Sequence, residues 1–368
     1  MLSSNNKINS IQLLRAVAVL LVVHCHILDM QQGNPLQRRF FYLQNFGAVG
    51  VDIFFVISGF IITVISRTYL PGKQGGYFFV KRMLRVVPLY WLVSFLITGY
   101  TYFRHGKLFA MASIIKTISF FPFFGKSATA FPVIYQGWTL SFELSFYSIT
   151  AIALATGSKK YMLMIVLFFC CFIGLNYVFD NQVIFINFFG NGIMLEFLMG
   201  VLVGLLFLSD LRLKPFISNI VTLAGIGGLA ASLVMGYGMI SEATYTFYGS
   251  LSLARSVIWG IPSALLVAGL VMKEKWRPLH IHPFWIAIGN ASFSVYLTHV
   301  FFIQPLYLRW QSWGLQGKIQ PDIQIFISMA IAVAGGYLFY RLVELPLLRR
   351  LGSYINKPDK PVSSIYSS

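Results

Sequence analysis

Long apolar segments recur along almost the whole chain, and their length constrains the fold more than any other feature. Ten of them approach the roughly 20 residues that a helix needs to cross the hydrocarbon core of a bilayer. Their approximate limits are 11–30, 47–66, 84–104, 135–156, 161–179, 184–208, 216–238, 251–272, 284–308 and 322–343. With 57% hydrophobic and 11% charged residues, the chain has more apolar surface than a soluble domain of 368 residues can cover. We therefore predict an all-α fold, a polytopic transmembrane helical bundle of about ten spans.

The same pattern indicates a single domain. We expect a membrane domain over residues 1–350 and a short polar tail over residues 351–368. Residues 105–134 hold a shorter apolar run, ASIIKTISFFPFF, which Lys116 and Pro122 interrupt. That run favours an interfacial or re-entrant segment over a full span. Any chemistry is therefore expected inside the membrane bundle.

Basic residues between the spans predict the orientation. A cytoplasmic N-terminus places sixteen Lys and Arg residues in the inner segments and eight in the outer ones. We therefore expect a multi-pass protein of the cytoplasmic (inner) membrane with both termini in the cytoplasm. The net charge of +17 does not indicate nucleic-acid binding, because the basic residues are scattered between apolar runs. The cysteines have no metal-ligand spacing, and no metal is expected.

Ionisable residues inside the first span, IQLLRAVAVLLVVHCH, are the first candidates for function. Such groups cost several kcal/mol in lipid unless they face a bundle interior or a wet cavity. At about 100° per residue, His26 returns to within about 20° of the face that carries Arg15, whereas His24 lies on the opposite face. A rise of about 1.5 Å per residue separates Arg15 and His26 by roughly 16 Å. One helix face thus carries a cation and, half a bilayer core away, a titratable base.

Two further arginines lie at the cytoplasmic entry of the third span. Arg82 and Arg85 are three residues apart and share a helical face, and Pro88 follows where a helix start or a kink is expected. Anchoring by positive charge on the inner side explains them without any function. Guanidinium groups also bind phosphate oxygens through two parallel hydrogen bonds, which makes a phosphate site the alternative.

The outer half of the bundle collects acids, bases and hydroxyls at similar depth. Asp52 and Glu143 lie early in inward-running spans, and His26 and His299 lie late in outward-running ones. Helical spacing also aligns two sets of polar residues with them, Gln136, Thr139, Tyr147 and Thr150 with Glu143, and Ser292 and Tyr296 with His299. Each group alone has a structural explanation, such as a salt bridge or a capped carbonyl. Four such groups at one depth favour a site.

Several of these segments resemble the integral-membrane acyltransferase family three. LLRAVAVLLVVHCH is similar to the opening helix of the family, whose Arg and His map to Arg15 and His26. GAVGVDIFFVISGF resembles its second helix, FFVKRMLRVVPLYW its Arg-x-x-Arg stretch at Arg82 and Arg85, and QGWTLSFELSFY its segment ending near Glu143. RSVIWGIPSALLVAGL, NASFSVYLTH and RLVELPLLRR resemble the later helices. Members transfer acyl groups, most often acetyl from acetyl-CoA, to hydroxyls of cell-envelope and exported glycans.

The resemblance and the depth argument together imply a mechanism. We expect Arg15, Arg82 and Arg85 to hold the phosphates of acetyl-CoA, with the pantetheine arm running along the first helix. His26 is expected to act as the general base, oriented by Glu143 or Asp52, on a hydroxyl of a polysaccharide, an O-antigen or a lipid-linked sugar. Arg255, Tyr296 and His299 are expected to contribute to acceptor binding. The partners are thus the glycan and membrane lipids, and a homo-oligomer is left open.

Other interpretations of the same residues remain at this point. A transient acyl-enzyme on Cys25 or Ser58 is an alternative to direct transfer, although neither residue has an evident activating partner in the sequence. A transporter or flippase of a lipid-linked sugar would use the same buried charges as a substrate or proton path, but the sequence shows no inverted repeat. A sensor or scaffold leaves the aligned polar residues unexplained.

Overall fold

The computed structural model describes residues 8–30, 46–120, 131–179, 183–237, 246, 249–315 and 318–355. Within these residues the chain forms helices and no strand, which confirms the predicted all-α fold. The helices are α1 (Asn9–Met30), α4 (Val49–Ser66), α5 (Gly75–His105), α6 (Met111–Ser119), α7 (Gly137–Ala155), α8 (Tyr161–Phe179), α9 (Ile184–Phe189), α10 (Ile193–Leu208), α11 (Pro215–Val234), α13 (Gly249–Arg255), α14 (Ile261–Trp276), α15 (Pro283–Ser312), α16 (Pro321–Phe339) and α17 (Leu345–Ile355). Two π-helical turns, η2 (Ser256–Gly260) and η3 (Tyr340–Glu344), join α13 to α14 and α16 to α17.

Nine helical segments in this part of the chain are long and apolar enough to cross a membrane, and α10 is a shorter apolar helix. The chain is therefore a multi-pass membrane protein. The predicted span over 184–208 is two helices, α9 and α10, separated at Gly190 and Gly192. Glycine disfavours a helix interior, and a Cβ at Gly192 would lie 2.4 Å from the Ser252 carbonyl carbon. Hydropathy alone does not predict this interruption of the helix, because the glycines lie within a continuous apolar segment.

Two other predicted boundaries differ from the structure. Helix α5 begins at Gly75, well before the predicted limit at residue 84, and it continues through Pro88. Its first turns hold two glycines and the apolar residues from Tyr77 to Val80, and Lys81 and Arg82 separate them from the apolar run that begins at residue 84. Of the predicted tail, residues 351–355 continue α17, and residues 356–368 lie outside the described part of the chain. Of the run after α5, the described residues form the nine-residue α6, too short to span a bilayer, and Pro122 lies outside the described residues.

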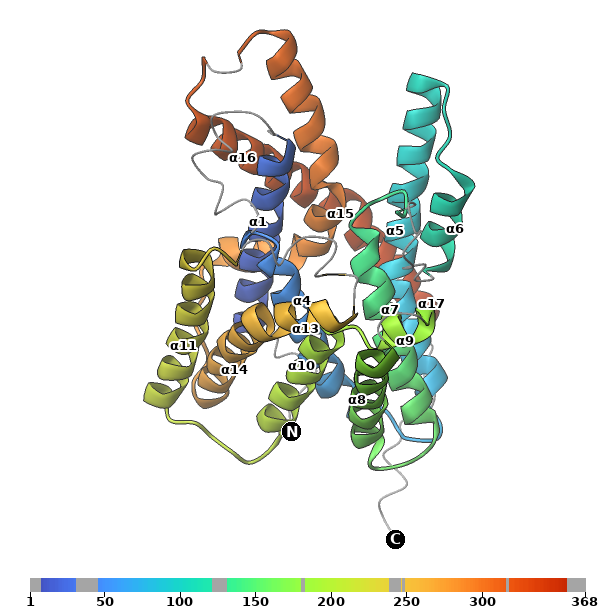
Figure 1. Cartoon of the computed structure of the whole chain (residues 1–368), viewed down its shortest axis with the longest axis vertical. Coiled ribbons are helices and arrows are strands. Elements are labelled where there is room, and N and C mark those ends of the chain that lie inside the picture. The colour runs from blue at the N-terminus through green and yellow to red at the C-terminus, as the bar shows by residue number, and fades with distance from the viewer. Residues whose placement is uncertain are drawn as a thin grey trace.

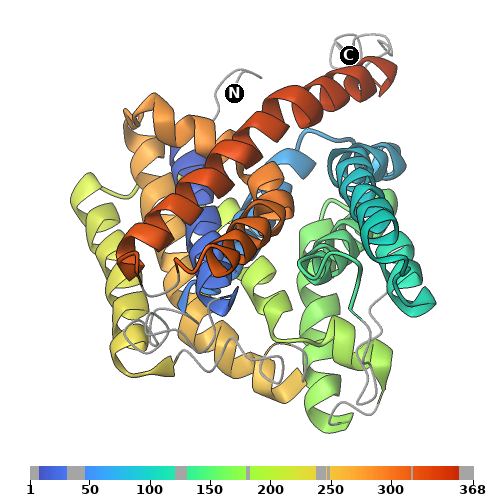
Figure 2. The same ribbon diagram turned by 90° about the horizontal axis from the view of Figure 1, so that it is seen from above.

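Helix α1 lies in the middle of the bundle, between α4 and α15 (Figure 1). Seen from above, α11 in yellow and α5 in blue-green lie on opposite sides of it, and α16 and α17 in red run along one edge (Figure 2). Ten of its residues with apolar side chains are buried, from Ile11 to Leu28. The polar residues of α1 therefore face protein on most sides, which is what their cost in lipid requires.

Glycines bring α4 and α10 into direct contact. A Cβ at Gly200 would lie 2.1 Å from the Val56 carbonyl oxygen, and one at Gly59 would lie 2.0 Å from the Phe197 carbonyl oxygen. Such distances exclude any side chain, so the two backbones touch through small residues, as in other membrane helix pairs. This contact positions α4, whose other side carries pocket residues.

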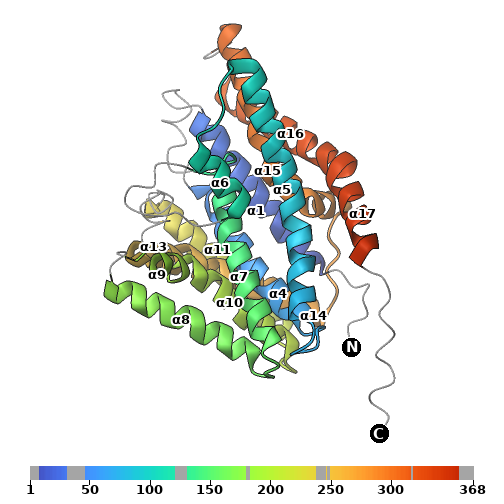
Figure 3. The ribbon, with the colours of Figure 1, turned by 90° about the vertical axis from the view of Figure 1, so that its right-hand side faces the viewer.

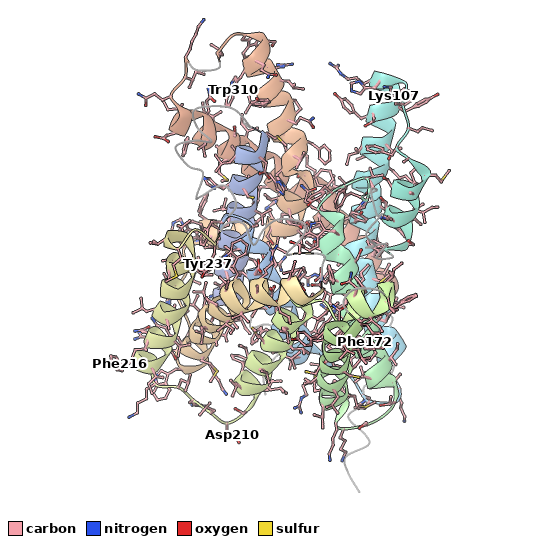
Figure 4. All side chains as sticks on the ribbon, in the orientation of Figure 1. Lys107, Phe172, Asp210, Phe216, Tyr237 and Trp310 are labelled. Atoms are coloured by element: carbon pink, nitrogen blue, oxygen red, sulfur yellow. The ribbon has the colours of Figure 1, made fainter. Side chains whose placement is uncertain are left out.

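The directions of the first and last helices show which end of the bundle each terminus is nearest to. Lys107 and Trp310 lie at one end, and Asp210 lies at the opposite end (Figure 4). Helix α17 runs toward the Asp210 end, and α1 runs away from it (Figure 3). This arrangement agrees with termini on one side of the membrane, and the assignment of that side to the cytoplasm stays a prediction.

Candidate active site

Five helices, α1, α4, α5, α7 and α15, line an open pocket of about 820 Å³, a volume that includes solvent space at its mouth. Its polar lining residues are Arg15, Ser58, Arg82, Arg85, Thr139, Glu143, Tyr147, Ser292 and Tyr296. On α7, three of them recur at intervals of four residues, which places them on one helical face. The polar stripe that the sequence predicts on α7 therefore faces this pocket with three of its members.

Three arginines line the pocket without a carboxylate partner. The Arg15 Nε donates a hydrogen bond to the Ser292 Oγ at 3.1 Å, and the Nε of buried Arg82 has no hydrogen-bond partner. Among the described residues, no carboxylate oxygen lies within the 4.0 Å of an ion pair from Arg15, Arg82 or Arg85. Arg82 is buried, Arg15 is half-buried and Arg85 is exposed, so the cost of an unpaired buried cation, several kcal/mol, applies chiefly to Arg82. The pocket is therefore built with an excess of positive charge.

The Glu143 carboxylate accepts two hydrogen bonds inside the pocket. Its Oε1 accepts hydrogen bonds from the Ser58 Oγ at 3.1 Å and from the Tyr147 hydroxyl. The sequence analysis offered Glu143 as a group that orients His26, but its hydrogen-bond partners are these two hydroxyls. Tyr147 follows Glu143 by four residues, so its side-chain contact agrees with the spacing.

His26 lies beside the pocket and does not line it. Its Nδ1 is 3.3 Å from the Asp29 Oδ2, and its ring stacks on that of His299 with centroids 5.1 Å apart. His299 in turn lies 6.4 Å from the ring of Tyr296, which lines the pocket. Helices α1 and α15 thus form a series of ring contacts from the pocket to His26.

His299 is fully buried and has one free acceptor. Its Nδ1 lies 3.1 Å from the Val295 carbonyl oxygen, which can only accept, so that nitrogen carries the proton. The Nε2 then has a lone pair that accepts no hydrogen bond from any of the described residues. A buried unsatisfied acceptor costs about 1–3 kcal/mol, which is unusual for a group with only a packing role.

Asp52 and Arg255 are partners of each other. The Arg255 Nε and Nη2 donate to the two Asp52 oxygens at 2.9 and 2.8 Å, and the Nη1 donates to the Thr246 Oγ1 at 2.9 Å. Both side chains are buried, and neither lines the pocket. This is a correction to the sequence-based interpretation, in which Asp52 orients His26 and Arg255 binds the acceptor. The direction in which each helix faces is a tertiary property that helical spacing does not determine.

Sequence reasoning also overlooked contact residues. Asp29 follows His26 by three residues and so shares its helical face, a signal that was available. Glu344, on the π-helical turn η3, accepts a hydrogen bond from the Ser294 Oγ at 2.5 Å and lies within electrostatic range of Arg15. The sequence of the closing segment alone does not predict that Glu344 lies near α1.

Comparison with known proteins gives the family. The family description "Acyltransferase domain" matches residues 8–341. The chain is similar to the exopolysaccharide production protein ExoZ of Rhizobium meliloti (strain 1021), with 30% identity over 83% of this chain and 90% of that protein. It is 24% identical to a Staphylococcus aureus (strain COL) protein named "Putative O-acetyltransferase", over 90% of this chain and 56% of that protein.

A third relative is nodulation protein 10 of Rhizobium leguminosarum bv. viciae, 29% identical over 38% of this chain and 42% of that protein. No solved structure matches. The family match covers the helices that build the pocket, and the resemblance seen in the sequence is confirmed. The chain therefore belongs to the integral-membrane acyltransferase family three, and it is a membrane acyltransferase.

Proposed function

We propose that this protein transfers acetyl from cytoplasmic acetyl-CoA to a hydroxyl of a cell-envelope or exported glycan, in the cytoplasmic membrane. The observation that carries the proposal is the group of three arginines, Arg15, Arg82 and Arg85, that line one pocket without a carboxylate partner. Arg82 is buried and Arg15 is half-buried, and protein interiors rarely hold unpaired cations, because the desolvation cost is not offset. An anionic ligand would offset it.

The phosphates of coenzyme A are suited to this site. Guanidinium forks match phosphate oxygens in geometry and charge, and each charge-assisted hydrogen bond contributes about 1.5–3 kcal/mol. The pocket also has apolar lining residues, among them Phe54, Phe55 and Ile57, which suit the pantetheine arm. With the phosphates at the arginines, the thioester would point along α1 toward Tyr296 and the two stacked histidines.

The reaction at the other end of the pocket is a direct displacement. Neutral His26 removes the proton of a sugar hydroxyl while the hydroxyl oxygen attacks the thioester carbonyl. The new C–O bond forms, the C–S bond breaks, and the departing thiolate takes the proton from the imidazolium, which leaves an ester and coenzyme A. Tyr296 lines the pocket and His299 lies between it and His26, and we assign them to acceptor binding.

The acceptor class is supported by the named relatives. One of them is named for exopolysaccharide production and another for O-acetyl transfer. We infer a polysaccharide, an O-antigen of lipopolysaccharide or a lipid-linked sugar as the acceptor. Family membership favours this enzyme over the transporter that the sequence left as an alternative.

An acyl-enzyme on Ser58 is a second route that one contact favours. The Ser58 Oγ donates to the Glu143 Oε1 at 3.1 Å inside the pocket, so a base is available to that hydroxyl. Cys25 is buried, and its Sγ is 4.0 Å from the Asp29 carboxylate, which disfavours a thiolate. A covalent acetyl group found on Ser58 after reaction with acetyl-CoA alone would support this route over direct transfer.

The test of the proposed function is single-turnover acetyl transfer by purified protein in detergent, where vectorial transport gives no signal. The acceptor is the glycan purified from a deletion strain, and mass spectrometry of surface glycans from deletion and complemented strains identifies the acetylated hydroxyl. His26→Ala should bind acetyl-CoA but lose a factor of about 10² to 10⁴ in rate. His24→Ala should retain substantial transfer, because His24 lies on the other face of α1. A normal rate for His26→Ala at matched protein levels would refute the assignment of the base.

A further inference from the structure

We propose that Asp29 is a positioning residue that holds His26 in the tautomer of a base, with Nδ1 protonated and Nε2 free. This inference rests on the proposed function, since it assigns a role within the same reaction. The role is one that the sequence analysis gave to Glu143 or Asp52. Neither of those carboxylates is available for it, because Glu143 accepts from Ser58 and Tyr147, and Asp52 is paired with Arg255.

The contact that carries the inference joins two neighbouring turns of α1. The Asp29 Oδ2 lies 3.3 Å from the His26 Nδ1, and the spacing of three residues places both side chains on one face. A carboxylate can only accept, so its approach favours the hydrogen on Nδ1 and leaves the lone pair on Nε2. The same logic orients the histidine of serine hydrolase triads, where the carboxylate acts through the imidazole.

The place of Asp29 in its helix argues against a role in helix stability. It lies in the last turn of α1, where a negative charge is unfavourable beside the negative end of the helix dipole. That turn has no basic residue. The carboxylate is also partly exposed, at 39% of its side-chain surface, and its Oδ2 lies 4.0 Å from the Cys25 Sγ and 3.3 Å from the His26 Nδ1. A partner that gains a proton during the reaction is a physical reason for a carboxylate there.

The stacked ring of His299 supplies the second constraint on His26. Its plane lies 29° from that of His26, and its own Nδ1 is held at the Val295 carbonyl oxygen, so it presents a fixed surface. His26 is thus limited in plane by His299 and in tautomer by Asp29. The His26 side chain is 22% exposed, which leaves an edge of the ring accessible to a hydroxyl.

The test is a double-mutant cycle on His26 and Asp29. The measured quantities are the single-turnover rate constant with acetyl-CoA and the glycan from the deletion strain, the Kd for acetyl-CoA, and the acceptor concentration at half-maximal rate. Asp29→Asn keeps the size of the side chain. It should lower the single-turnover rate constant by about 10- to 1,000-fold, and it should change the Kd for acetyl-CoA and the half-maximal acceptor concentration less than about twofold. Asp29→Glu should recover part of the rate.

In the His26→Ala protein, the added Asp29→Asn change should have no further effect on the residual rate, because a residue that acts through the imidazole has nothing left to act on. Asp322→Asn is the matched control, since Asp322 is an exposed carboxylate in the first turn of α16, and it should transfer at the normal rate. Equal losses from Asp29→Asn with and without His26 would overturn the inference and leave the proposed function intact. A normal rate for Asp29→Asn would overturn it too, whereas the absence of acetyl transfer by the wild-type protein would refute the proposed function itself.

Discussion

Replacement of Arg82 by alanine tests the donor site most directly, because the structure predicts opposite effects on binding and on stability. Arg82 is buried on α5, its guanidinium carbon is 6.0 Å from the centroid of the Phe78 ring, and its Nε has no hydrogen-bond partner. No carboxylate among the described residues is paired with it. Arg82→Ala therefore leaves no acid without a partner and removes a cation that the empty pocket does not stabilise.

The expected magnitudes follow from that arrangement. One lost charge-assisted contact to phosphate, about 1.5–3 kcal/mol, weakens acetyl-CoA binding about 10- to 150-fold. Without donor, the free energy of unfolding should stay the same or rise. Arg82→Lys should lie between, since lysine keeps the charge but loses the two parallel hydrogen bonds. The loss should shrink at high salt, because screening weakens the wild-type contact.

The assay is thermal unfolding in detergent with and without acetyl-CoA, beside direct measurement of the Kd. At a donor concentration 100 times the wild-type Kd, binding stabilises the wild type by about 2.7 kcal/mol, and a variant with 100-fold weaker binding gains only about 0.4 kcal/mol. Arg255→Ala is the contrasting variant. This substitution leaves the buried Asp52 carboxylate without its ion-pair partner, so it should lower the free energy of unfolding by about 3–5 kcal/mol in the absence of donor.

Two results would refute this reasoning. If both Arg82→Ala and Arg85→Ala bind acetyl-CoA as the wild type does, these arginines only anchor α5 at the inner membrane face. A loss of stability in Arg82→Ala as large as that in Arg255→Ala would show that Arg82 is held by the protein itself, contrary to its lack of an acidic partner.

Three further outcomes are expected. Gly200→Leu should prevent the contact of α4 with α10, because a Cβ there would lie 2.1 Å from the Val56 carbonyl oxygen, and size-exclusion chromatography should show aggregated or missing protein. Tyr296→Phe should keep the fold and cost about 0.5–1.5 kcal/mol of stability, since only the hydroxyl contacts to Thr139 at 2.9 Å and to the Gln136 carbonyl oxygen are lost, and thermal unfolding measures it. A reporter active only outside the cytoplasm should be silent within residues 159–160 and active near Asn34, which lies outside the described residues, and the reverse pattern would contradict the predicted orientation.

Much of the fold was predictable because hydrophobic length is a local property. A helix that crosses a bilayer needs about 20 apolar residues wherever it stands in the chain, so spans such as 161–179 were predicted with the limits that α8 has. Boundaries failed where charges interrupt a helix, as Lys81 and Arg82 do after the start of α5 at Gly75, or where glycines divide an apolar run, as at Gly190 and Gly192.

The arginines of the pocket were predictable for a similar reason. Arginines are costly in the hydrocarbon core unless they face protein or water, so Arg15 signals a cavity, whereas for Arg82 and Arg85 the sequence left a phosphate site beside anchoring at the inner membrane face. The structure brings all three to one pocket, with Glu143 and Tyr147 from α7. Helical spacing was sufficient to place the two α5 arginines on one face, and the resemblance supplied the link between helices.

The pairing of the acids was decided by the tertiary structure alone. Periodicity places Asp52, Glu143 and His26 at similar depths, but it does not determine how each helix is rotated about its axis or which helices are neighbours. Rotation and neighbours follow from backbone contacts such as that between Gly59 and Gly200. They turn Asp52 toward Arg255 and Glu143 toward Ser58, and the acid within reach of His26 is Asp29 of the same helix. Sequence by itself thus determined a membrane bundle with a cationic interior, and packing decided which charges meet, because a contact between helices depends on residues far apart in the chain.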